Sequence, residues 1–285
     1  MNTKIFVDSA CDLPNEIIKK YNVEVLPFNI HINNDKYLDG IEIDTSDVYQ
    51  AIREDKSLST SQVAPHIFEK AFRKEAEKGN DCIYISFSSQ MSGAYQTGKM
   101  MAEKIKNEFE NIKIKIIDSR AGSGATGLIV YKAAQLLSDN IPLEKVLKAV
   151  KFWAEHIEHL FILDDLKQLQ KGGRISKTKS FIGNILNIKP ILHVKEGKIE
   201  LLQKSRGTKK AINELIKLFK QKSYNIKEQL IAVTHADDLN KAQILKKKIE
   251  DLGGEVFFTE MIGGVLGTHL GIRGVGIFFF NKKWE

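Results

Sequence analysis

The sequence predicts an α/β protein of two lobes, the first built on a parallel, doubly wound sheet and the second a mixed α/β domain. Short apolar segments alternate with amphipathic helices in the first half, as at residues 83–87, 93–109, 114–117 and 124–137. Such alternation is typical of a parallel sheet covered on both faces. After Pro142 the regular alternation of strands and helices changes, and a hairpin is expected around Glu196 and Gly197. We therefore expect two domains, residues 1–155 and residues 156–285.

Local signals then define the elements in order. Asp12 and Pro14 begin the first helix, the polar side chains at residues 44–46 cap a second, and Pro65 opens a third. The remaining elements of the first lobe are a strand at 5–7, an extended segment at 23–32, a helix end near Arg53, a polar loop at 56–64, and the four segments named above. After Pro142 we expect helices at 143–153, 208–221 and 239–252, strands at 160–163, 230–234, 256–259 and 275–280, the hairpin at 191–202, and glycine-rich turns at 171–176 and before residue 275.

Composition excludes several classes of protein. Of 285 residues, 42% are apolar, 43 are Lys or Arg and 36 are Asp or Glu, which is typical of a globular chain. Cys11 and Cys82 stand alone, so we expect a reducing cytoplasm and neither a disulfide framework nor a metal ribbon. No stretch is apolar enough to span a membrane. The net charge of +7 comes mostly from scattered lysines, a pattern typical of a solvated surface rather than of a nucleic-acid site.

Two motifs indicate other functions when taken alone. Residues 122–127 read Gly-Ser-Gly-Ala-Thr-Gly and match the dinucleotide fingerprint between a strand and a helix. The acidic residue that should end a second strand about 20 positions later is missing, so we interpret these residues as allowing close helix-to-sheet packing. His156 and His159 have a spacing that binds metal on one helical turn, but a third ligand is lacking. We expect a surface helix end there and no metal.

Hydroxyl-rich turns at two expected helix starts indicate an anion site. Ser92 and Gly93 follow a strand, and the free N–H groups and positive dipole of the next helix favour a carboxylate or phosphate. A simple N-cap explains Ser92 equally well. Residues 59–62, Ser-Thr-Ser-Gln, form a second cluster, and the two loops can converge on one anion. Arg174 lies in a glycine-rich turn, and His269 lies in a glycine-rich loop where it has no apolar face to fill.

Taken together, seven motifs spread over nearly the whole chain resemble the DegV family. They are Asp-Ser-Ala-Cys-Asp-Leu at 8–13, Thr-Ser-Gln at 60–62, the segment 88–96, Lys-Gly-Gly-Arg-Ile-Ser at 171–176, Asn-Ile-Lys-Pro-Ile-Leu at 187–192, Ser-Arg-Gly-Thr-Lys-Lys at 205–210 and Gly-Thr-His-Leu-Gly at 267–271.

The resemblance implies a function. Members of that family bind a long-chain fatty acid between two α/β lobes, and many are the binding subunit of bacterial fatty acid kinase. It implies a tunnel at or near the lobe interface, with the carboxylate-binding loops in residues 1–155 and the cover of the acyl chain in residues 156–285. It implies neither a cofactor nor catalysis by this chain alone. A separate ATP-dependent kinase subunit would form the acyl phosphate for phospholipid synthesis, and transient contact with a membrane surface is compatible with that role.

The resemblance also implies roles for single residues. The carboxylate-holding positions of the family are matched by Thr60, Ser92 and the amide of Gly93. Weaker candidates for the same role are Thr268 and Ser61. The family positions at the head-group mouth, or those involved in phosphotransfer, are matched by Arg174, Arg206 and His269. His269 is also counted among the fatty-acid-binding residues.

Two departures from the family pattern bear on kinase coupling. The family usually continues after its His loop with Gly-Pro-Gly, whereas this chain reads Gly271-Ile272-Arg273. The family's second arginine after Arg206 is Thr208 here. We expect an altered loop beside His269 and altered docking of a kinase.

Three alternatives stay open from the residues. Ser92 is the candidate nucleophile of a serine hydrolase, although no Gly-x-Ser-x-Gly elbow surrounds it. Residues 122–127 are the candidate site of a nucleotide-dependent enzyme. A lipid-sensing regulatory protein would share the fatty acid site but lack a kinase.

Overall fold

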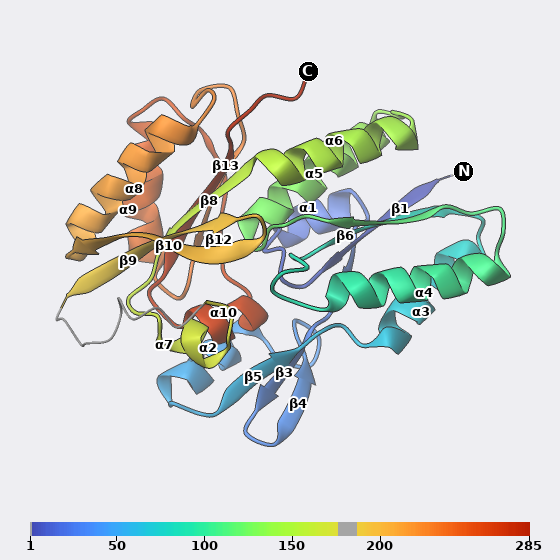
Figure 1. Cartoon of the computed structure of the whole chain (residues 1–285), viewed down its shortest axis with the longest axis horizontal. Coiled ribbons are helices and arrows are strands. Elements are labelled where there is room, and N and C mark those ends of the chain that lie inside the picture. The colour runs from blue at the N-terminus through green and yellow to red at the C-terminus, as the bar shows by residue number, and fades with distance from the viewer. Residues whose placement is uncertain (1, 176–186) are drawn as a thin grey trace.

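A computed structural model describes residues 2–175 and 187–285 and contains two large sheets (Figure 1). The first is parallel, with strand order β2-β1-β6-β7. Its strands are β1 (Thr3–Asp8), β2 (Glu24–Leu26), β6 (Asp81–Ser86) and β7 (Ile114–Asp118). Its helices are α1 (Asn15–Lys20), α3 (Pro65–Ala76), α4 (Ala94–Glu108), α5 (Gly124–Ser138) and α6 (Leu143–His156).

Both faces of this sheet are buried because alternate side chains of each strand point to opposite sides. Phe6 and Tyr84 pack with Phe72 and Phe68 of α3. Val7 and its neighbours on β6 belong to a second apolar cluster, with α5 and α6. The strands therefore read as continuous apolar runs, which is why they could be recognised in the sequence.

The second sheet is mixed, with strand order β10-β9-β8-β13-β11-β12. Only β11 and β12 pair in parallel. Its strands are β8 (Ile157–Ile162), β9 (Ile188–Lys195), β10 (Lys198–Arg206), β11 (Ile231–His235), β12 (Val256–Met261) and β13 (Val275–Phe280). Helices α8 (Thr208–Lys222) and α9 (Leu239–Glu250) pack against it. The predicted α/β class with one parallel and one mixed sheet is confirmed.

Helix α5 lies between the two sheets, because it contacts β1 and β6 on one side and β11 and β13 on the other. Its small residues permit this: a Cβ at Gly124 would lie 2.9 Å from the Phe278 ring, and one at Gly127 would lie 2.8 Å from the Cys11 carbonyl oxygen. The residues that match a nucleotide fingerprint thus serve close packing here.

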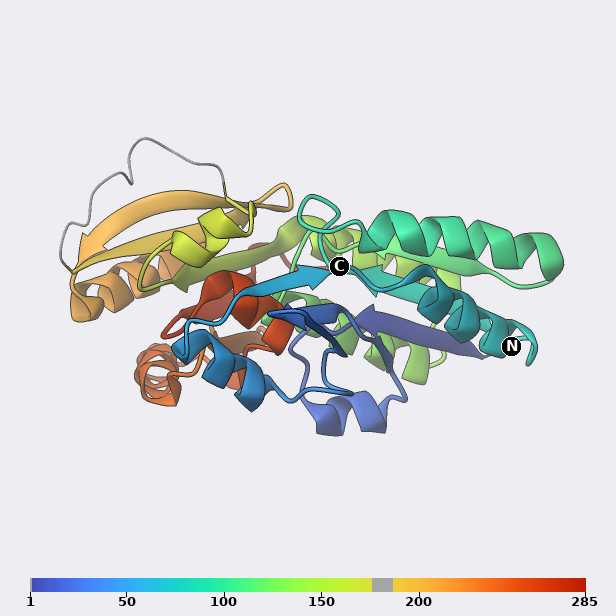
Figure 2. The ribbon, with the colours of Figure 1, turned by 90° about the horizontal axis from the view of Figure 1, so that it is seen from below.

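A third unit lies below the two large sheets in Figure 1 and faces the viewer in Figure 2. It comprises a small sheet of order β4-β3-β5, formed by β4 (Asp35–Leu38), β3 (Asn29–Ile32) and β5 (Leu58–Ser61), together with helix α2 (Thr45–Arg53). Helix α10 (Gly264–Leu270) comes from the far end of the chain and contacts α2, β3, β5 and α7 (Lys167–Lys171). Segments more than 200 residues apart in the sequence meet there.

Four sequence expectations are corrected. The extended segment 23–32 is split into β2 and β3 around Pro27, which lacks the N–H that a ladder needs. The polar loop 56–64 contains β5, and the glycine-rich loop before residue 275 contains α10. His159 belongs to β8 and is buried, whereas His156 ends α6, so the two histidines do not share a helical turn.

We keep the division at residues 155 and 156 as a proposal. It falls at the last residue of α6, and each large sheet takes its strands from one side of that point. No helix within the described residues is long and apolar enough to cross a membrane. Both cysteines are free and buried.

Candidate ligand-binding site

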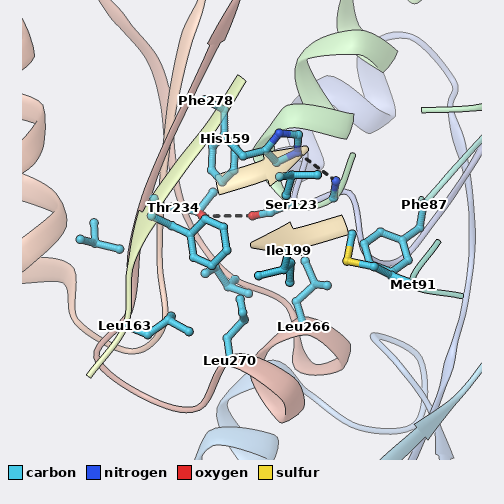
Figure 3. Close-up of a pocket in the computed structure, with 16 residues that line it drawn as sticks. Phe87, Met91, Ser123, His159, Leu163, Ile199, Thr234, Leu266, Leu270 and Phe278 are labelled. Carbon is cyan, nitrogen blue, oxygen red and sulfur yellow. Dashed lines mark hydrogen bonds between the residues drawn. The ribbon is translucent and has the colours of Figure 1, made fainter. Parts of the chain in front are cut away.

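An apolar cavity lies between the mixed sheet and α10 (Figure 3), and the space within it, open solvent included, is about 500 Å³. Its apolar wall residues come from the β6–α4 loop, β8 and the residue after it, the β9–β10 hairpin, the β12–α10 loop, α10 and β13. They are Phe87, Met91, Phe161, Leu163, Val194, Ile199, Ile262, Leu266, Leu270, Val275 and Phe278.

Three polar residues also line this cavity, but most of their hydrogen-bonding atoms are already engaged. The Ser123 Oγ donates to Asp12 Oδ2 at 2.5 Å and lies 3.0 Å from Thr234 Oγ1. The Gly122 N–H donates to Nε2 of His159 at 3.3 Å. Burial lowers the pKa of His159 to about 3, so this imidazole is neutral at physiological pH. Its Nδ1 has no partner among the described residues. The cavity therefore presents a predominantly apolar wall without a charge.

A second cavity adjoins the first, and the space within it, open solvent included, is about 430 Å³. The two share five wall residues, Phe87, Met91, Ile199, Leu266 and Leu270. The polar side chains that line the second cavity are Thr60, Gln62, Ser92, Arg174 and His269. An apolar cavity thus lies beside a cavity with hydroxyl, amide, guanidinium and imidazole groups.

Thr60 reaches the second cavity because alternate residues of β5 face opposite sides. Its Oγ1 lies 2.7 Å from Nε2 of His269, which is 209 positions away in the sequence. Ser61 points the other way, and its Oγ lies 3.0 Å from Nε2 of His31 at the exposed surface. Of these neighbours in sequence, only Thr60 lines the cavity.

His269 lies in the last turn of α10 and is 9% exposed. Gly172 covers its other side, since a Cβ at Gly172 would lie 2.2 Å from His269 Nδ1. Burial, together with the positive charge of Arg174, lowers the pKa of His269 to about 4. The imidazole is therefore neutral at pH 7. The hydroxyl of the preceding residue, Thr268, donates to the Gly264 carbonyl inside the helix at 2.9 Å and lines neither cavity.

Ser92 and Gly93 form the turn that leads into α4. The Ala94 N–H donates to Ser92 Oγ at 3.2 Å, so this hydroxyl caps the turn while it lines the cavity. Gly93 is the N-cap residue. A Cβ there would lie 2.1 Å from Oε1 of Gln62, whose Nε2 donates to Thr97 Oγ1 at 2.7 Å. Gln62 was not among the predicted site residues, although the motif that contains Thr60 ends with it.

Arg174 supplies the positive charge of the second cavity. Its Nε donates to the Met91 carbonyl at 3.2 Å, and Nη1 donates to the Gly172 carbonyl at 2.5 Å. In the part of the chain that the structure describes, no carboxylate forms an ion pair with Arg174. A half-buried guanidinium without a counter-charge favours an anionic ligand.

The remaining sequence candidates lie elsewhere. Arg206 ends β10, pairs with Ile188 in the ladder, and is exposed outside both cavities. Ser176, the last residue of the Arg174 motif, lies outside the described residues. Beside His269, the Arg273 N–H donates to the Ala236 carbonyl at 2.6 Å, and the Arg273 carbonyl accepts from Lys241 Nζ. These hydrogen bonds hold the loop at residues 271–273, where this chain reads Gly-Ile-Arg instead of the family's Gly-Pro-Gly.

The other chemistries considered from the sequence gain little support. Ser92 makes no hydrogen bond to an imidazole or carboxylate in the described residues, whereas a serine hydrolase needs such a base. In residues 2–175 and 187–285 no group of three side chains is suited to hold a metal ion.

Fold and site together define a two-sheet α/β protein in which an apolar cavity adjoins a polar cavity that contains a cationic side chain. Residues 2–282 match the model of the DegV family, whose members are described as uncharacterised proteins. The chain belongs to the DegV family.

Relatives and solved structures agree over nearly the full length. A DegV domain-containing protein of Clostridium perfringens is 34% identical over 285 residues, which cover 99% of this chain and 98% of the relative. A Thermus thermophilus DegV family protein, studied for fatty acid binding, superposes with a TM-score of 0.90 at 27% identity, covering 98% of this chain and 99% of that one. Bacillus subtilis DegV, a fatty acid binding protein, superposes with a TM-score of 0.86 at 28% identity, covering 99% and 100%.

Proposed function

We propose that this chain binds a long-chain fatty acid, with the tail in the apolar cavity and the carboxylate in the adjoining polar cavity. The observation that carries the proposal is the shared wall of five apolar residues between the two cavities. Such a wall suits a ligand that is apolar over most of its length and charged at one end. The fatty acid ligands of the Thermus and Bacillus relatives support the same choice.

Most of the affinity comes from the tail. Burial of one CH2 group contributes about 0.8 kcal/mol, so a C14 to C18 tail contributes on the order of 10 kcal/mol before ordering costs. The largely apolar wall of the first cavity has no charge to desolvate. Shape rather than hydrogen bonding would therefore select the length and unsaturation of the chain.

The head is held by hydrogen-bond donors and one positive charge rather than by an enclosed ion pair. Ser92 offers a hydroxyl, and the hydrogen-bonded pair of Thr60 and His269 offers one further donor. Arg174 supplies a positive charge from its half-buried position. Hydrogen bonds from such groups to an ionised carboxylate are roughly twice as strong as those between neutral partners. Gln62 lines the same cavity and packs closely against Gly93, which fixes the position of the Ser92 turn.

We further propose that the held carboxylate is presented to an ATP-dependent kinase subunit, which forms an acyl phosphate used in phospholipid synthesis. The kinase would carry out the chemistry, and this chain would act as the carrier. Arg174 and His269 would stabilise the negative charge that increases at the head as phosphate is transferred. Arg206, exposed at the end of β10, would contact the kinase rather than the fatty acid.

The ligand proposal is tested by organic extraction of the purified protein and mass spectrometry of the extract. We expect one fatty acid per chain. Covalent labelling of Ser92 by a serine-reactive probe, or a bound nicotinamide nucleotide without a fatty acid, would refute it.

The carrier proposal is tested separately with a fatty acid kinase subunit and ATP. We expect Arg174→Ala and His269→Ala to retain tail-driven binding but to lower acyl phosphate formation by at least about tenfold, since one lost electrostatic contact costs on that order. Full acyl phosphate formation by both variants would show that the two residues have no part in transfer.

A further inference from the structure

An open groove lies on the surface next to the ligand site, and the space within it, open solvent included, is about 1,370 Å³. Its wall comes from the β1–α1 loop, α1, β2 and the loop after it, the β4–α2 loop, the start of α2, the end of β12 and the β12–α10 loop. A thin wall separates it from the apolar cavity: Asp12 lines the groove and is bonded to Ser123, which lines the cavity. Ile262 and Gly263 likewise lie on opposite sides of that wall.

The groove is acidic although the chain carries a net charge of +7. Four carboxylates line it, from Asp12, Asp39, Asp44 and Glu260, and none of the described residues that line it is cationic. None of the four forms an ion pair within the described residues. Glu16 of α1 adds to the negative charge near Glu260. Burial raises the pKa of Asp12 to about 7 and that of Asp39 to about 6, so the accessible negative charge of the groove comes mainly from Asp44 and Glu260.

The same groove exposes large apolar side chains. Ile41 is 68% exposed, more than any other large apolar residue in the described chain, and Met261 is 39% exposed. Both line the groove, together with Ile18, Val25 and Pro27. Exposed apolar side chains inside a concave, charged surface are typical of a protein-binding site.

This surface does not suit the fatty acid. Its carboxylates would repel an acyl carboxylate, and the polar cavity with Thr60 and Arg174 already provides a head site. A molecule that binds in this groove must carry positive charge, because like charges that face each other across an interface destabilise the complex.

We propose that the groove binds a segment of a partner protein that carries lysine or arginine beside apolar side chains. The cations face the carboxylates of Asp44 and Glu260, while the apolar side chains cover Ile41 and Met261. This inference does not depend on the identity of the ligand in the apolar cavity.

Methionine methyl NMR tests the proposal on the full chain with bound ligand. The probe is a short capped peptide of lysine and leucine. We expect it to shift the methyl signal of Met261 and to leave that of Met100, which is 54% exposed on α4, unchanged. The signal of Met91, which lines both ligand cavities, should also stay unchanged.

Two controls separate charge from apolar contact. The double variant Asp44→Asn with Glu260→Gln should weaken peptide binding by about tenfold, whereas Asp47→Asn, on the same helix but outside the groove, should not. A peptide with serine in place of leucine should bind more weakly than the lysine and leucine peptide.

Three results would overturn the proposal. The first is equal shifts at Met100 and Met261, and the second is unchanged affinity in the double variant. The third is a Met261 signal that moves with protein concentration in the absence of peptide, because the occupant would then be a second copy of this chain.

Discussion

At the scale of single residues, the contact between Thr60 and His269 links the two halves of the chain at the head of the ligand site. The distance of 2.7 Å joins a strand of the small sheet to α10. Neither residue is informative alone, since a hydroxyl in a polar segment and a histidine among glycines are both common. Because the Thr60 hydroxyl and the His269 ring are in contact, the site has a hydrogen-bonded pair of polar groups beside the positive charge of Arg174.

Thr60→Val should lower the affinity for a long-chain fatty acid about five- to tenfold, because the variant keeps the shape but loses a hydrogen bond of about 1 to 1.5 kcal/mol. Titration calorimetry with a delipidated protein measures this. Ser61→Ala is the matched control, since the Ser61 hydroxyl contacts His31 on the outer surface. If both variants lost affinity equally, Thr60 would have no specific role at the head.

At the scale of elements, α10 forms despite its glycines because close packing requires them. A Cβ at Gly264 would lie 2.7 Å from Ile30 Cδ1, and one at Gly267 would lie 2.9 Å from the Tyr49 ring. Glycine lowers helix propensity by about 1 kcal/mol relative to alanine, so the sequence indicates a loop. Tertiary contact with α2 and the small sheet reverses that preference.

The end of α7 positions α10 in the same way. Gly172 has ordinary helical dihedral angles, so Gly172→Ala is tolerated by the backbone, but its methyl group would occupy the place of the His269 ring. We expect the ring to move toward solvent. Its pKa should then rise from about 4 toward its ordinary value near 6.5, because burial is the main cause of the lowering.

NMR titration of the His269 ring signals measures this shift, and Lys171→Ala, an exposed neighbour at the end of α7, serves as the control. The shift has a sign that can be checked: in the variant the imidazole should begin to protonate as the pH falls below about 6.5, whereas in the parent chain it should stay neutral to about pH 4. An unchanged His269 pKa in Gly172→Ala would mean that Gly172 does not hold the ring in place.

At the scale of the whole molecule, the ligand site is assembled from both halves of the chain, so occupancy should stabilise the folded protein as a unit. A ligand present at about 100 times its Kd stabilises the native state by about 2.7 kcal/mol, which corresponds to a rise in Tm of roughly 5 °C or more for a chain of this size.

Differential scanning calorimetry of the delipidated protein with a long-chain fatty acid measures this rise. The alcohol of equal chain length is the control ligand, because it keeps the tail and removes the carboxylate. We expect a clearly smaller rise with the alcohol. Equal rises would show that the polar cavity does not recognise a carboxylate.

Much of the fold could be predicted from the sequence because its strongest signals are local. The apolar runs of β1, β6 and β7, the amphipathic α4 and α6, and the hairpin turn at Glu196 and Gly197 are confirmed. The strands β4 and β5 were missed because their side chains are polar and half exposed. His159 was placed on a helix because its spacing from His156 fits a helical turn, although the chain changes from α6 to β8 between them.

The sequence by itself determined the α/β class, the parallel sheet with two buried faces, and the hydroxyl, arginine and histidine residues available for an anion. These follow from side-chain period and local caps, which act over a few residues. Only the tertiary structure decided that Thr60 rather than Ser61 lines the cavity, that Gln62 and Gly172 shape it, and that an apolar cavity and a polar one share wall residues. Those features depend on contacts between segments up to 209 positions apart, and the direction of such contacts is set by how the sheets and α10 pack rather than by any local pattern.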